Sequence, residues 1–192
     1  MRFRKIIAVI AAAALGVSLC GCTSPEKSEI SGKLKVIATI FPAYDFARQV
    51  FGDTADVKML LKPGQESHSY DPSAKDIVEI SGCDLFVYNG GESDQWVESV
   101  LKSAPEVETF RMTDAVSLLD EEVTEGMQNA GEHDHVEEEH EDEYDEHVWT
   151  SPDNASAIVK ALGKRAAELF PENADSVTAN ADSYAGKVDE LD

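Results

Sequence analysis

Two histidines, His68 and His147, combine a metal-binding side chain with a position on a predicted loop. His68 lies in the polar stretch 62–72, and His147 lies in Glu-His-Val-Trp-Thr-Ser-Pro, just before a predicted helix. Neutral imidazole suits Zn²⁺ and also serves Mn²⁺, Fe²⁺ and other first-row metals. Taken singly, either histidine could be an ordinary surface or core residue, so the pair indicates a metal site only if the fold brings the two loops together.

A very acidic segment, Asp120 to Glu146, holds the other three histidines, His133, His135 and His140. It contains 14 acidic residues and no Lys or Arg, in a chain of 192 residues whose formal net charge is −22. This balance disfavours nucleic acids, which are held by clusters of Lys and Arg, and it favours cations as partners. Imidazoles and carboxylates in a disordered loop could collect Zn²⁺ and raise its local concentration. A solvated run of charges without this role is the alternative.

Strands and helices are predicted to alternate from residue 33 onward. The predicted strands are 33–40, 55–61, 84–88 and 107–111, and the predicted helices between them are 44–51, 73–81 and 94–102. Strands that are continuous apolar runs, separated by helices, indicate an α/β fold with a parallel sheet covered on both faces. Ligands of such sheets gather at the loops after the carboxyl ends of strands. His68 follows the second strand and is therefore well placed to contact a ligand.

Two more helices are predicted after the acidic segment. Ser151 is a good N-cap and Pro152 a good first helical residue, Phe170-Pro171 interrupts the pattern, and a narrow apolar stripe then runs to Leu191. The sequence closes on acidic residues without a cap, which is unfavourable at the negative end of a helix dipole. We therefore expect the sequence to stop inside a helix, with a fraying amphipathic tail as the alternative.

The amino terminus has the pattern of an export signal. A basic start precedes the apolar run 6–19, which is too short to span a bilayer as a helix. Leu19-Cys20-Gly21-Cys22 resembles a bacterial lipobox and implies lipid attachment at Cys22; an ordinary cleaved signal is the alternative. Residues 22–32 are interpreted as a flexible tether. Cys83 then has no partner for a disulfide, and we expect it to be a small buried thiol.

Two segments carry a family resemblance, Pro63 to Ser73 and Glu146 to Pro152. Together with Phe41-Pro42, Trp96 and the lipobox, they resemble the metal-binding solute-binding lipoproteins of ABC transporters, the zinc/manganese uptake family. That family has two α/β lobes joined by a long bridging helix. Its metal is held between the lobes by one His from each segment, with a third His and a carboxylate from the second lobe. The resemblance implies that His68 and His147 are first-lobe ligands, although Ser67 stands where the family usually has Pro.

The resemblance also implies a division of the chain. Residues 1–21 would be the lipoprotein signal peptide, 22–32 the tether, 33–119 the α/β N-terminal lobe and 120–146 the disordered His- and acid-rich loop. Residues 147–170 would hold the helix after the second ligand motif, and 171–192 would begin the bridging helix. The C-terminal lobe would be missing, so these residues alone could not form the complete site.

The function implied by the resemblance is binding without turnover. A His- and acid-rich loop before the second motif is typical of the zinc members of the family. We therefore expect a monomeric Zn²⁺-binding lipoprotein on the outer face of the bacterial cytoplasmic membrane, the periplasmic side in a Gram-negative cell, that delivers metal to an ABC permease. The alternatives are the same fold serving Mn²⁺ or Fe²⁺, and a fragment that only buffers metal. A zinc hydrolase is disfavoured because the sequence has no His-Glu-x-x-His motif and no nucleophile elbow.

Overall fold

A computed structural model describes residues 32–65, 67–119 and 144–191 of the chain. The predicted signal peptide, almost all of the tether and most of the acidic segment lie outside these residues. The predicted lipidation site Cys22 and the histidines His133, His135 and His140 therefore lie outside them too.

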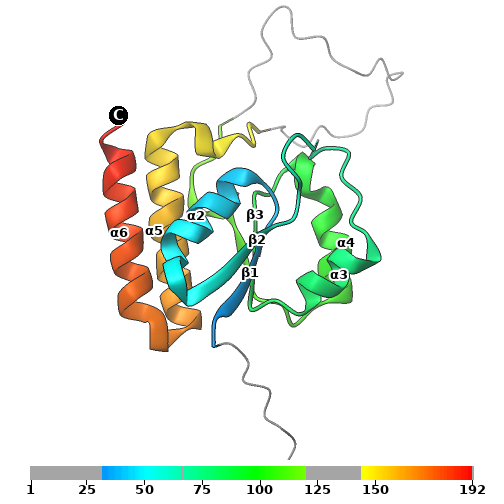
Figure 1. Cartoon of the computed structure of the whole chain (residues 1–192). Coiled ribbons are helices and arrows are strands. Elements are labelled where there is room, and N and C mark those ends of the chain that lie inside the picture. The colour runs from blue at the N-terminus through cyan, green and yellow to red at the C-terminus, as the bar shows by residue number, and fades with distance from the viewer. Residues whose placement is uncertain (1–31, 66, 120–143, 192) are drawn as a thin grey trace, which may run out of the picture. The chain divides into compact units, whose positions relative to one another are not determined.

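A parallel sheet of four strands organises the described residues (Figure 1). Its strands are β1 (Leu34–Ala38), β2 (Ala55–Met59), β3 (Leu85–Tyr88) and β4 (Thr109–Arg111), in the order β2-β1-β3-β4. In the register of the sheet, Val36 of β1 lies opposite Val57 of β2 and Leu85 of β3. The predicted α/β fold with a parallel sheet is confirmed.

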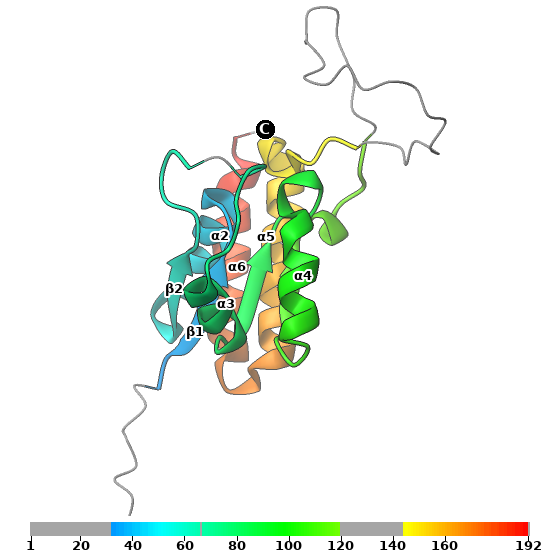
Figure 2. The same cartoon turned by 90° about the vertical axis from the view of Figure 1, so that its right-hand side faces the viewer.

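Helices cover both faces of the sheet, as Figures 1 and 2 show. On one face lie α2 (Phe41–Phe51), α5 (Pro152–Leu169) and α6 (Ala174–Asp189), and on the other lie α3 (Ala74–Ser81) and α4 (Gln95–Ser103). Because side chains alternate across a strand, Val36 and Ala38 pack under the first set of helices while Ile37 packs under the second. The short 3₁₀ turns are Gly52–Thr54, Glu92–Asp94, Met112–Ala115, Val148–Thr150 and Pro171–Asn173.

Local sequence explains where the helices next to the candidate site begin. The Ser73 hydroxyl accepts a hydrogen bond from the Asp76 N–H, and the Asp76 carboxylate accepts one from the Ser73 N–H, which makes a capping box at the start of α3. The predicted start of α5 is also confirmed, with Ser151 as its N-cap. The predicted start of α2 at residue 44 is wrong, because the helix begins at Phe41 with Pro42 in its first turn. Proline is tolerated there, since the first N–H groups of a helix have no partner within it.

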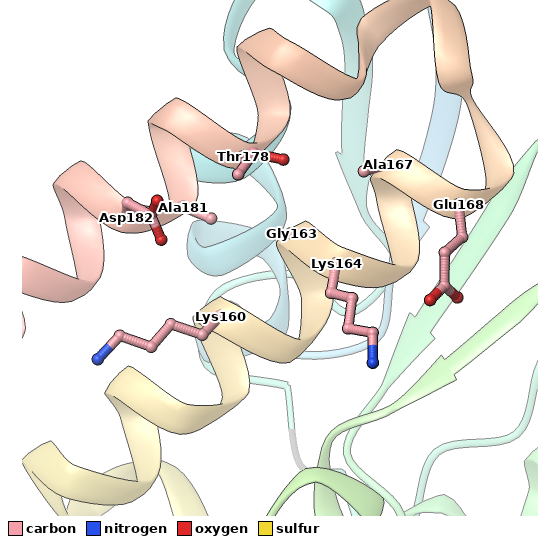
Figure 3. Close-up of a pocket in the computed structure, with 8 residues that line it drawn as sticks. All are labelled: Lys160, Gly163, Lys164, Ala167, Glu168, Thr178, Ala181 and Asp182. Atoms are coloured by element: carbon pink, nitrogen blue, oxygen red, sulfur yellow. The ribbon is translucent and has the colours of Figure 1, made fainter.

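Helices α5 and α6 pack closely side by side. A Cβ atom added at Gly163 of α5 would lie 2.4 Å from the Ala181 Cβ of α6, so the absence of a side chain at Gly163 permits this approach. The buried residues Val177, Ala181 and Val188 belong to the predicted apolar stripe, whereas Leu191 beyond the helix is 76% exposed. Figure 3 shows the groove between the two helices, which is lined by Lys160, Gly163, Lys164, Ala167, Glu168, Thr178, Ala181 and Asp182. Among the residues that the structure describes, no helix is long and apolar enough to cross a membrane.

Candidate metal site

The order of the strands sets the place of the candidate site. The chain passes from β1 to β2 on one side and then crosses to β3 on the other, so the carboxyl ends of β1 and β3 form a topological switch point. Ligands of open α/β sheets bind at such points. The polar residues Thr39 and Asn89, which directly follow these two strands, are both fully buried. The loop that carries His68 follows β2 at the same edge of the sheet.

The structure brings His68 beside the segment that carries His147. The His68 Nε2 atom lies 3.5 Å from the Glu146 Oε1 atom, and Glu146 directly precedes His147 in the chain. The His68 side chain is 52% exposed, whereas that of Glu146 is 9% exposed. The two loops that carry the candidate ligands His68 and His147 therefore meet, although they lie almost 80 residues apart in the chain.

Glu146 is held in place by the loop that follows β3. Its Oε2 atom accepts a hydrogen bond from the Ser93 N–H at 3.0 Å, and its backbone carbonyl accepts one from the Asn89 side-chain amide at 2.9 Å. Gly91, with φ of +91°, lies directly against this carboxylate, because a Cβ atom there would lie 2.4 Å from Glu146 Oε2. Only glycine satisfies both the backbone angle and the close approach.

His147 is oriented by its neighbour Asp145. The Asp145 Oδ1 atom accepts a hydrogen bond from the His147 N–H at 2.8 Å and lies 3.0 Å from the His147 Nδ1 atom. These contacts, the backbone hydrogen bond first, hold the pKa of Asp145 below its usual value. An ionised carboxylate favours the tautomer with the proton on Nδ1, which leaves Nε2 as the metal-binding nitrogen. The ring also packs beside Trp149, at 5.4 Å between centroids.

A second buried carboxylate, Asp94, lies at the same edge. It accepts hydrogen bonds from the backbone N–H groups of Asn89 at 2.8 Å and Gly90 at 3.0 Å. Burial raises the pKa of Asp94 to about 6, and the charge of Glu146 acts in the same direction. Buried carboxylates of this kind give the edge a negative potential, which favours a cation.

Among the described side chains at this edge, His68 and Glu146 form a pair, which is not a complete set of metal ligands. Within residues 32–65, 67–119 and 144–191, no three His, Cys, Asp or Glu side chains are placed together so as to hold a metal ion. His68 lies beside Glu146, whereas the ring of His147 contacts Asp145. Cys83 is partly buried, and burial raises the pKa of its thiol to about 11, so it is an unreactive thiol.

Glu146 and Asp94 were not identified as site residues from the sequence. Glu146 stood as the last acid of the acidic segment, which is a kind of segment that is usually solvated, and as the first residue of the second resemblance segment, where only His147 was named as a ligand. Its position immediately before a candidate histidine was the available signal. The signal for Asp94 was weaker: it follows the sequence Asn89-Gly90-Gly91, which is typical of a turn, after the predicted strand 84–88.

Comparisons with known proteins agree with this fold. The family ZnuA, described as zinc-uptake complex component A periplasmic, matches residues 36–192. The zinc-binding lipoprotein AdcA of Streptococcus pneumoniae strain R6 is 34% identical over 190 residues, which cover 98% of this chain and 37% of that protein. The high-affinity zinc uptake system protein ZnuA of Bacillus subtilis is 35% identical over 196 residues, which cover 96% of this chain and 58% of that protein.

Solved structures give the same result. Zn(II)-bound AdcA from Streptococcus pneumoniae superposes with a TM-score of 0.70 and 32% identity, over 84% of this chain and 32% of that one. The metal-dependent lipoprotein YcdH from Bacillus subtilis superposes with a TM-score of 0.68 and 30% identity, over 83% of this chain and 53% of that one. These neighbours are two-lobed metal-binding proteins, and the described residues form a portion of the N-terminal lobe. The resemblance seen in the sequence is confirmed: the chain belongs to the ZnuA family of solute-binding proteins of zinc uptake systems.

Proposed function

We propose that this chain binds Zn²⁺ at the carboxyl edge of its sheet and is the first-lobe part of a lipoprotein that delivers zinc to an ABC importer. The observation that carries the proposal is the approach of the His68 loop to the His147 segment, with His68 Nε2 at 3.5 Å from Glu146 Oε1. Relatives named as a zinc-binding lipoprotein and as a zinc uptake system protein support the choice of metal.

His68 and His147 are the proposed metal ligands. Both side chains are about half exposed on loops, so a metal ion can reach them from solvent. Asp145 orients the ring of His147, as carboxylates do for zinc-bound histidines in known sites. A third histidine and a carboxylate from a second lobe would complete the site, as in the family.

Zinc is preferred over manganese because of the ligand types. Imidazole suits Zn²⁺, whereas Mn²⁺ is better matched by carboxylates, carbonyls and water. The acidic segment, through His133, His135 and His140, would collect Zn²⁺ near the site. Binding of Mn²⁺ or Fe²⁺ by the same fold, or buffering of metal by this chain alone, are the competing functions.

The remaining features of the sequence support a location at a membrane surface. Residues 1–21 would be removed as a signal peptide, Cys22 would carry the lipid, and 22–32 would tether the lobe to the outer face of the cytoplasmic membrane. Residues 33–119 and 147–170 would form the lobe around the loop 120–146, and 171–192 would begin the bridging helix. The protein would act as a monomer that binds metal and passes it to a permease without turnover.

Calorimetric titration with Zn²⁺ and Mn²⁺ tests the proposal. We expect the unaltered chain to bind Zn²⁺ more tightly than Mn²⁺, and the double substitution His68→Ala with His147→Ala to remove the tightest site. A matched control replaces His133, His135 and His140 by Ala, which should lower the number of bound Zn²⁺ ions and leave the tightest site intact. Unchanged tight binding in the double variant would exclude these two ligands, and stronger binding of Mn²⁺ would favour the competing metal.

A further inference from the structure

We propose that Glu146 is itself a metal ligand of this lobe, with its Oε1 atom binding the same ion as His68 Nε2. The inference rests on the proposed metal-binding function and concerns the ion bound by this chain, where Glu146 would join His68 and His147 as a third protein ligand.

The spacing of the two atoms fits a shared metal ion. A tetrahedral Zn²⁺ with bonds of about 2.0–2.2 Å to nitrogen and oxygen holds two of its ligand atoms about 3.3–3.5 Å apart. The Nε2 atom of His68 and the Oε1 atom of Glu146 lie 3.5 Å apart. That distance is long for a direct hydrogen bond, whose usual range ends near 3.2 Å. The pair is therefore spaced as two ligands of one ion.

The Glu146 carboxylate is fixed as a ligand must be. Glu146 as a whole is 7% exposed, and its Oε2 atom accepts a hydrogen bond from the Ser93 N–H at 3.0 Å. The oxygen that lies near His68 is the other one, Oε1. Hydrogen bonds of this kind to the second oxygen orient a ligating carboxylate in metal sites. The amide of Asn89 holds the backbone of Glu146 at the same point.

The charges around Glu146 favour a cation next to it. Asp94 is buried at the same edge, 5% exposed, and its carboxylate and that of Glu146 repel each other. Burying charged carboxylates is costly unless they are paired with cations or bind metal. A divalent ion bound between Glu146 and the exposed ring of His68 would relieve this cost.

Cobalt titration of the full chain tests the assignment, because the visible spectrum of Co²⁺ depends on its ligands. The test variant is Glu146→Gln, which keeps an oxygen able to accept from the Ser93 N–H. The control is Glu98→Gln, the same change on an 83% exposed side chain of α4. Both are made in chains whose His133, His135 and His140 are replaced by Ala, and circular dichroism checks their folding.

We expect Glu146→Gln to weaken Co²⁺ and Zn²⁺ binding by at least the roughly 10- to 100-fold that loss of an outer-shell partner costs, and to change the spectrum of the saturated complex. Glu98→Gln should change neither. A second variant, Glu146→Asp, keeps the charge and withdraws the carboxylate, and should also weaken binding and shift the spectrum.

The outcomes separate this inference from the proposed function. If His68→Ala abolishes binding while both Glu146 variants keep the affinity and spectrum of the unaltered chain, Glu146 is no ligand and the metal site stands. A weaker affinity with an unchanged spectrum would also overturn the inference, since it would assign Glu146 to positioning alone. If His68→Ala has no effect either, the proposed function fails.

Discussion

Replacing Gly91 by alanine should damage the candidate site from a position that binds no metal itself. Gly91 has φ of +91° and ψ of −166°, a region that is open almost only to glycine. A Cβ atom there would lie 2.4 Å from Glu146 Oε2 and 2.8 Å from Glu146 Cβ. The Glu146 side chain must therefore move away, and with it the contacts to Ser93 and His68.

The expected cost has two parts. Backbone strain at Gly91 contributes about 1–3 kcal/mol. Loss of the buried acceptor of the Ser93 N–H adds about 1–3 kcal/mol. The sum, about 2–6 kcal/mol, is a large share of the free energy of unfolding of a typical domain, which is about 5–15 kcal/mol. Gly64→Ala is the control, because Gly64 has φ of +80° but nothing within 4 Å of an added Cβ atom. Its cost should be strain alone, about 1–2 kcal/mol.

Urea denaturation with a chelator present, followed by Zn²⁺ titration, measures both effects. Gly91→Ala should lower the free energy of unfolding more than Gly64→Ala does, and it should weaken Zn²⁺ binding relative to the unaltered chain. A Gly91→Ala chain that equals Gly64→Ala in stability and the unaltered chain in Zn²⁺ affinity would refute the packing of Glu146 described above.

Two further predictions concern stability. The pKa of Asp94 is about 6 in the folded chain against 3.8 for an ordinary aspartate, so the folded state binds more protons and its stability falls as pH rises from about 4 to about 6. Asp94→Asn should remove this loss of about 3 kcal/mol, which urea denaturation of the metal-free chain from pH 4 to 8 measures. If the free energies of unfolding of the variant and the unaltered chain differ by the same amount at every pH, the prediction is contradicted. Gly163→Ala should destabilise the chain by about 1–3 kcal/mol relative to Gly186→Ala. A Cβ atom at position 163 would collide with Ala181, whereas one at position 186 would have nothing within 4 Å. Equal thermal stability of the two variants would disprove the tight packing of α5 and α6.

Local sequence was sufficient for the elements that position the site. The apolar runs predict the four strands, and Ser151 predicts the start of α5, because these signals act over a few residues. The predicted helix 73–81 agrees with α3, whose N-cap is Ser73. The helix was predicted to start after Phe41-Pro42, whereas α2 includes both residues, because the first turn of a helix accepts proline.

Tertiary contacts explain what the sequence did not indicate. Glu146 belongs by composition to a solvated acidic run, and its burial depends on the Ser93 N–H, 53 residues away. The same holds for Gly91, whose role depends on Glu146 lying against it. His68 and His147 could be named as candidates from their types and loop positions, but the meeting of their loops is a property of the strand order.

Anomalous diffraction at the zinc absorption edge, from crystals of the chain grown with Zn²⁺, tests the central claim most directly. The account predicts an anomalous peak at the carboxyl edge of the sheet, about 2.0–2.1 Å from a ring nitrogen of His68 and of His147. Well-ordered loops with peaks elsewhere and none between these two rings would contradict it.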